Sequence, residues 1–138
     1  MVQVIMGLRG SGKTKLLIEM VTKTARTGTG HVIVIERGKK LESEIHAREA
    51  RLIDTKDYGV RSYQVLRGFI TGLYAGNYDT THIFIDSLLK IVECNDMAEA
   101  ERFLDWLARF GAENSITFAV TVSADAQTAS EKIKSYFM

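Results

Sequence analysis

The residues with the clearest chemistry are the eight from Gly7 to Thr14, which match the Walker A pattern G-x-x-x-x-G-K-[ST]. Glycines let the backbone fold closely over a polyphosphate, so that successive N–H groups point at its oxygens. The Lys13 side chain is expected to reach the β- and γ-phosphates and to assist catalysis, and the Thr14 hydroxyl is expected to bind Mg²⁺. The predicted nucleotide-binding residues are Gly7, Leu8, Arg9, Gly10, Ser11, Gly12, Lys13 and Thr14.

The segments on either side have the composition that a phosphate-binding loop (P-loop) requires. Val2–Met6 is apolar and rich in β-branched residues, which favours a strand. Apolar residues recur at helical spacing from about Lys13 to Arg26, and the start of that helix adds free N–H donors and the positive end of a dipole. The alternative is a glycine-rich turn that precedes a helix by coincidence. The flanking strand and helix favour nucleotide binding.

Strands alternate with helical stretches along the chain, which predicts right-handed βαβ units. Runs that are apolar on both faces are typical of a parallel sheet covered by helices. The expected class is therefore α/β, a three-layer sandwich with a five-stranded parallel sheet. The predicted strands are Val2–Met6, His31–Ile35, Ser62–Leu66, His82–Asp86 and Ile116–Val122. Helices are predicted over Lys13–Arg26, over Lys39–Leu52, around Phe69–Tyr74, over Asp96–Gly111 and near the C-terminus.

Polar residues follow several of these strands. In open α/β sheets, ligands bind at the carboxyl ends of the strands, which brings together the loop, Glu36, Asp86 and Ser123. Asp86 is expected to hold Mg²⁺ directly or through water, the alternative being a turn or helix cap. Glu36 is the candidate catalytic carboxylate that polarises the attacking water, the alternative being a solvated charge paired with a neighbouring cation.

These features together resemble the core of the RecA-like ATPases, which include recombinases and ring-shaped replicative helicases. The loop, the strand that ends in Glu36 and the strand that ends in Asp86-Ser87 carry the resemblance. It implies strand order 3-2-4-5-1, MgATP binding and ATP hydrolysis, which we expect to be slow, within an assembly. The chain departs from the family in lacking its further strands and DNA-contacting loops. The family often has a polar sensor, commonly Gln or Asn, at the end of the fifth strand. Thr121 and Ser123 occupy that region here, with Gln127 further on, and Ser123 is the possible counterpart of the sensor.

Composition narrows the class and the partners. The 138 residues suit one nucleotide-binding domain, 1–138, and the net charge of +1 gives no support for nucleic acid. The single cysteine excludes an internal disulfide framework and fits a cytoplasmic protein. No apolar run is long enough for a membrane span, and no signal peptide is recognised.

The identity of the nucleotide and of any protein partner follows less directly. The sequence contains no Asn/Thr-Lys-x-Asp segment that would select guanine, so ATP is favoured over GTP. In the implied order the first strand lies at a sheet edge, which the last helix or another subunit would cover, so a homo-oligomer or protein partner is possible. Arg37, Lys39 and Lys40 could contact nucleic acid or a neighbouring subunit's nucleotide, but a solvated basic face is favoured.

Two other functions fit the loop. A small nucleoside or metabolite kinase is compatible with the chain's size, although the sequence has no cysteine set for the zinc lobe of type II thymidine kinases and no arginine-rich lid. A nucleotide-sensing module that binds without turnover is favoured by the absence of a glutamate after Asp86, where Ser87 stands.

Overall fold

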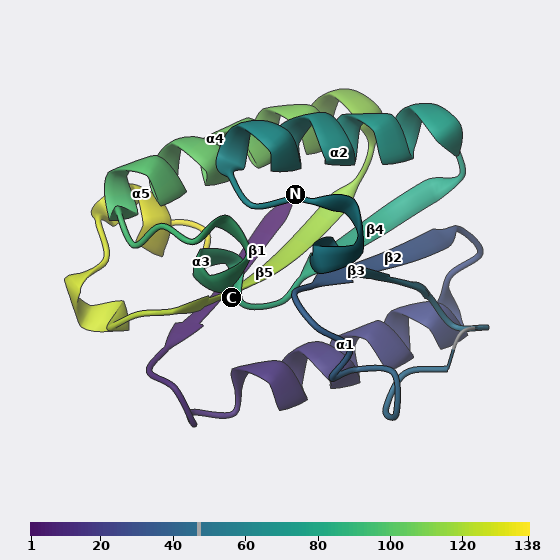
Figure 1. Ribbon diagram of the computed structural model, residues 1–138, viewed down its shortest axis with the longest axis horizontal. Coiled ribbons are helices and arrows are strands. Elements are labelled where there is room, and N and C mark those ends of the chain that lie inside the picture. The colour runs from purple at the N-terminus through teal and green to yellow at the C-terminus, as the bar shows by residue number, and fades with distance from the viewer. Residues whose placement is uncertain (47) are drawn as a thin grey trace.

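A parallel five-stranded sheet forms the centre of the computed structural model, which describes residues 1–46 and 48–138 (Figure 1). Its strands lie in the order β1-β5-β4-β2-β3. Their bounds are β1 (Val2–Gly7), β2 (His31–Glu36), β3 (Arg51–Asp54), β4 (Thr80–Ile85) and β5 (Thr117–Ser123). Read from the other edge, this is the order 3-2-4-5-1 that the resemblance implied, although the third strand is a different segment from the one predicted.

Helices cover both faces of the sheet. α1 (Lys13–Thr27) lies on one face, and α2 (Tyr63–Gly76) and α4 (Met97–Asn114) lie on the other (Figure 1). The arrangement fits a three-layer sandwich. The shorter elements are η1 (Thr55–Tyr58), α3 (Leu88–Val92), η2 (Ala126–Thr128) and α5 (Glu131–Lys134).

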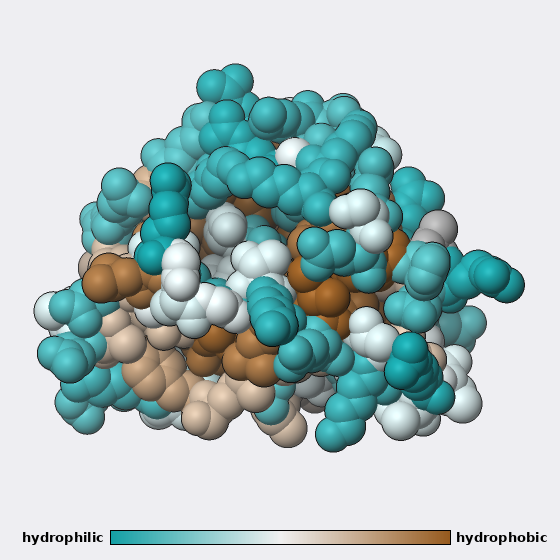
Figure 2. Space-filling view, turned by 90° about the horizontal axis from the view of Figure 1, so that it is seen from below, coloured by the Kyte–Doolittle hydropathy of each residue, from teal (hydrophilic) through white to brown (hydrophobic). Residues whose placement is uncertain are grey.

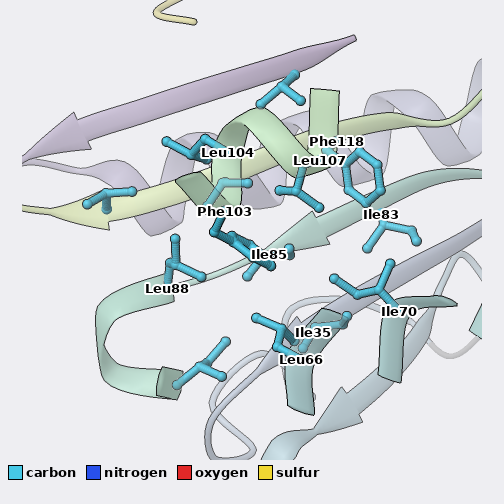
Figure 3. Packing of buried hydrophobic residues seen from close by; sticks show 14 of the residues in the cluster. Ile35, Leu66, Ile70, Ile83, Ile85, Leu88, Phe103, Leu104, Leu107 and Phe118 are labelled. Carbon is cyan, nitrogen blue, oxygen red and sulfur yellow. The ribbon is translucent and has the colours of Figure 1, made fainter. Parts of the chain in front are cut away.

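The alternation of side chains along each strand divides the core into two clusters, one on each face. Figure 3 shows the cluster between the sheet and the pair α2 and α4, which includes Ile35, Leu66, Ile70, Ile83, Ile85, Phe103, Leu107 and Phe118. The cluster on the α1 face contains Leu17, Val21, Val32, Val34, Phe84 and Ala119. Residues two positions beyond Val34, Phe84 and Ala119 therefore share the α1 face, at the carboxyl end of the sheet.

The strand predicted over Ser62–Leu66 is wrong, because this segment begins α2. Ser62 caps the helix, and its Oγ accepts a hydrogen bond from the Val65 backbone N–H at 3.2 Å. Leu66 and Ile70 are both fully buried one turn apart, so helical packing against the sheet outweighs the β-rich local composition.

The helix predicted over Lys39–Leu52 is also wrong. Turns occupy this segment as far as residue 46, and Ala47 lies outside the described residues. The third strand starts instead at Arg51, and β3 pairs with β2 from Ile33 to Glu36. Leu41 and Ile45 are buried in the α1-face cluster. Their spacing therefore identified two buried residues correctly, but these residues lie in turns and not in a helix.

The C-terminal segment covers the free edge of β1. The Val4 backbone N–H donates to the Tyr136 carbonyl at 2.9 Å, and Val4 forms a parallel bridge with Phe137. Of the last helix and a second subunit, the two covers that the sequence suggested, the structure supports the C-terminal end of the chain, through the residues that follow α5.

A glycine substitution tests how closely α4 packs on β5. A Cβ on Gly111 would lie 2.6 Å from the Ile116 carbonyl oxygen and 3.3 Å from the Phe118 ring. Gly111→Ala should therefore lower the free energy of unfolding by about 1–3 kcal/mol, as overpacking does. Gly68 in α2 has nothing within 4 Å of its Cβ position. Gly68→Ala should instead raise that free energy by up to about 1 kcal/mol, because alanine is the better helix former.

Urea unfolding of the two alanine variants and the parent measures both effects. A Gly111→Ala protein as stable as the parent would contradict the close contact between α4 and β5.

Candidate nucleotide-binding site

The loop after β1 has the backbone that its glycines permit. Gly10 and Gly12 have φ values of +84° and +87°, in the left-handed region that favours glycine. Gly12 is also the N-cap of α1, and it has no side chain that could bond to the first N–H groups of the helix. The first turn of α1 contains no acidic residue. These N–H groups are therefore suited to bind an anion.

The side chains of the loop close it into a compact ring. Lys13 Nζ donates to the Leu8 carbonyl at 2.9 Å and to Ser11 Oγ at 3.4 Å. A Cβ on Gly7 would lie 2.6 Å from Ser11 Oγ, so a larger residue at this position would displace the Ser11 hydroxyl, which accepts a hydrogen bond from Lys13. The ammonium group of Lys13 contacts loop atoms only, which leaves its charge available to a phosphate.

Thr14 and Asp86 meet across the start of α1 and the end of β4. Thr14 Oγ1 lies 3.3 Å from each carboxylate oxygen of Asp86. Asp86 is only 7% exposed, and its Oδ1 accepts a second hydrogen bond from Thr121 Oγ1 at 2.7 Å. The two residues that the sequence assigned to Mg²⁺ are therefore in contact.

Thr121, which stands with Ser123 in the sensor region at the end of the fifth strand, has a role that the sequence did not assign to it. Its hydroxyl donates to Asp86 and accepts from the Ser87 backbone N–H at 2.7 Å, so it fixes both residues after β4. Ser123, the sensor candidate, lies beside Gly7 instead. The strand order could have predicted this contact. Ile85 pairs with Val120, so the next residues of the two strands, Asp86 and Thr121, are neighbours.

A pocket of about 770 Å³ opens at this edge of the sheet. Its size is within the roughly 300–1,000 Å³ of ordinary ligand sites. Five of its lining side chains are basic, and the five come from three separate segments of the chain. The lining residues are Arg9, Gly10, Gly12, Lys13, Thr14, Lys15, Lys40, Ser87, Leu89, Lys90, Asn95 and Ser123. Lys40 thus lines the pocket, with its side chain exposed, and Lys15, Lys90 and Asn95 were not among the predicted site residues.

Glu36 lies beside Asp86 but does not line this pocket. It is 4% exposed, and its Oε2 accepts a hydrogen bond from the Leu41 backbone N–H at 3.1 Å. Burial raises the pKa of the Glu36 carboxyl, and the charges of Asp86 and Asp54 add to the rise, while backbone N–H groups of Leu41 and Lys40 oppose it. Glu36 faces a small hollow of about 60 Å³ that Gly38 and Asp54 also line. It is therefore a buried carboxylate that the connection after β2 holds in place.

The oxygen donors present fit Mg²⁺ better than a soft metal. Magnesium is held by one or two carboxylates together with substrate phosphates and water. Thr14 and Asp86 supply a hydroxyl and a carboxylate, and the Thr121 hydrogen bond to Oδ1 leaves Asp86 Oδ2 for a cation. Among residues 1–46 and 48–138, no group of three or more His, Cys, Asp or Glu side chains is placed to hold a metal by itself. A metal here would depend on the nucleotide for its remaining ligands.

A scan against protein-family models gives no match, and a search of curated proteins gives none either. The function of this chain is therefore inferred from the geometry of the pocket and its loop.

No helix in the described part of the chain is long and apolar enough to cross a bilayer. Figure 2 shows the molecule from the α1 side, where hydrophilic residues cover most of the surface and apolar residues lie between them.

Proposed function

We propose that this chain binds MgATP in the pocket at the carboxyl edge of the sheet and hydrolyses it slowly, as a small RecA-like ATPase. The observation that carries the proposal is the contact of the Thr14 hydroxyl with the buried Asp86 carboxylate, directly behind the pocket that Thr14 and Lys13 line. This contact joins the two halves of a Mg²⁺–phosphate site that lie 72 residues apart in the sequence.

Each residue has a distinct task in this proposal. The backbone N–H groups of the loop and the Lys13 ammonium bind phosphate oxygens. Mg²⁺, when bound, neutralises charge on the β- and γ-phosphates. Asp86 and Thr14 hold it, and Thr121 orients Asp86. Glu36, as the carboxylate next to Asp86, accepts the proton of the attacking water.

The RecA-like assignment is supported by the strand order and by the neighbouring positions of Glu36 and Asp86 at the ends of β2 and β4. The lone cysteine supports a cytoplasmic setting. ATP is proposed rather than GTP because the sequence lacks a guanine-selective segment. An assembly with further copies or a protein partner belongs to the same proposal.

One observation favours a second candidate, a module that binds nucleotide and senses it without turnover. The Glu36 carboxylate is bonded to the Leu41 backbone and does not line the pocket. Among the described residues that line the pocket, none carries a carboxylate that could replace Glu36 as a base. Binding without measurable hydrolysis would identify this second function.

Dependence of binding on Mg²⁺ tests the proposal. Calorimetric titration with a non-hydrolysable ATP analogue should give tighter binding with Mg²⁺ than with EDTA. Thr14→Val keeps the shape of the side chain but loses the hydroxyl, and should reduce the Mg²⁺-dependent gain by about 10- to 100-fold, as loss of a metal-site support does. Thr14→Ser, the matched control, should keep the gain. A parent protein that does not bind the analogue in Mg²⁺ would contradict the proposal.

A further inference from the structure

Two lysines outside the P-loop line the nucleotide pocket. Lys40 follows β2 by four residues, and Lys90 lies in α3, four residues after Asp86. They come from separate segments, and both share the pocket with Lys13 and Thr14. Neither forms an ion pair with a carboxylate among residues 1–46 and 48–138. Their neighbour Lys39, by contrast, pairs with Asp57 at 3.2 Å.

The backbone at both lysines is anchored. Arg37 Nη1 donates to the Lys90 carbonyl at 3.1 Å and forms an ion pair with Glu93, also at 3.1 Å. Before Lys40, the Gly38 backbone N–H donates to Asp54 at 2.8 Å, and after it the Leu41 N–H donates to Glu36. The structure thus fixes the backbone from which each lysine reaches the pocket, while both side chains stay exposed to a ligand.

Positive charge is crowded at this place, where the two lysines share one pocket. The pKa of Lys90 is lowered, chiefly by its side-chain contact with Lys40, then by burial and the charges of Lys40, Arg37 and Lys56. Like charges are normally kept apart or separated by a carboxylate. Two lysines without one form a site that an anion with several oxygens would stabilise.

The position of Lys40 and Lys90 in the pocket indicates which part of a nucleotide they would contact. A Mg²⁺ ion held by Thr14 and Asp86 would neutralise the terminal phosphates, so the side of the pocket next to Asp86 would face the γ-phosphate. α3 begins directly after Asp86-Ser87, and it carries Lys90 on that side. We propose that Lys40 and Lys90 bind the γ-phosphate and so form a sensor, within one chain, that distinguishes ATP from ADP.

This sensor rests on the proposed MgATP binding and adds a regulated element to it. Lys40 precedes Leu41, whose N–H holds the Glu36 carboxylate. A γ-phosphate bound by Lys40 pulls on the connection that fixes Glu36, and Lys90 joins the same phosphate to α3. The nucleotide state is thereby coupled to the position of the catalytic candidate and to the segment from Ser87 to Glu93, whose two end residues have left-handed φ values of 57° and 52°.

The test compares triphosphate and diphosphate affinity. In calorimetric titrations with Mg²⁺, the Lys40→Ala/Lys90→Ala protein should lose about 10- to 100-fold in affinity for a non-hydrolysable ATP analogue, the usual value of one or two charge-assisted hydrogen bonds. Its affinity for ADP should change by less than about 3-fold, since ADP lacks the phosphate concerned. Lys39→Ala/Lys56→Ala makes the same change in net charge outside the pocket lining, and should retain the parent's ratio of the two affinities.

The possible results distinguish the γ-phosphate sensor from the nucleotide-binding site itself. An equal loss for both nucleotides would reduce the lysines to general electrostatic attraction and overturn the sensor, with the nucleotide site intact. No loss for either would also overturn it, since the lysines would then be solvated. If the parent binds neither nucleotide, the proposed function fails and the sensor fails with it.

Discussion

Replacing Lys13 by alanine is expected to weaken binding of ATP by about 100-fold or more, because two phosphate contacts to a cation are lost at a site where each is worth roughly 1.5–3 kcal/mol. The fold should survive the change. Lys13 Nζ bonds only to Leu8 and Ser11 in an exposed loop, and truncation of such a side chain usually alters stability by about 0.5 kcal/mol or less.

Calorimetry measures the affinity, and thermal unfolding provides a second readout. A ligand at 100 times its dissociation constant stabilises a protein by about 2.7 kcal/mol, so MgATP should raise the melting temperature of the parent but not of the variant. Lys23→Ala removes the same charge from the same helix, α1, away from the pocket, and should bind like the parent. Retained binding by Lys13→Ala would show that the loop does not hold the nucleotide.

The parts of the fold that the sequence predicts well are those whose residue pattern has one structural solution. The Walker A pattern between an apolar strand and an amphipathic helix fixed the order of three elements, from β1 to α1. The apolar runs that end in Glu36 and Asp86 likewise proved to be central strands, β2 and β4. In each case local composition, burial and position in the sheet all agree.

The wrongly predicted elements are those in which the local sequence pattern is compatible with both a helix and a strand. Tyr63–Leu66 has the composition of a strand, yet Ser62 is a good helix cap and apolar residues continue at helical spacing to Leu73. Residues 51–54 are too few for a periodic pattern, and β3 forms only because β2 offers it a free edge. Pairing in the sheet therefore decided these elements, and that information is not local.

The candidate site likewise contains residues that local motifs predict and residues that only the fold brings to the site. Lys13, Thr14 and Asp86 follow from motif and strand end, and the structure brings them together. Thr121, Lys40 and Lys90 carry no motif in their own segments. Thr121 contacts residues 34 and 35 positions away, and the two lysines meet the loop only in the pocket, so the folded arrangement is needed to assign their roles.

Glu36→Gln is expected to reduce ATP turnover by about 10²- to 10⁴-fold, the usual contribution of a general base, while MgATP binding stays close to that of the parent. The amide oxygen can still accept the hydrogen bond from the Leu41 N–H, so the connection after β2 should keep its position. Single-turnover hydrolysis and calorimetry on the same preparation measure the two quantities. Glu44→Gln makes the same change at an exposed position on that connection and should leave both unaltered.

The pH dependence gives this prediction its sharpest check. Burial raises the pKa of the Glu36 carboxyl, so the basic form is lost at a higher pH than for an ordinary glutamate, and turnover by the parent should fall as the pH drops through that raised pKa. A carboxyl whose pKa is higher in the folded than in the unfolded chain lowers stability at pH values above both, so Glu36→Gln should be no less stable at neutral pH. Normal hydrolysis by a stable Glu36→Gln protein would remove Glu36 as the base. Binding without hydrolysis by the parent at every pH would instead identify the nucleotide-sensing module.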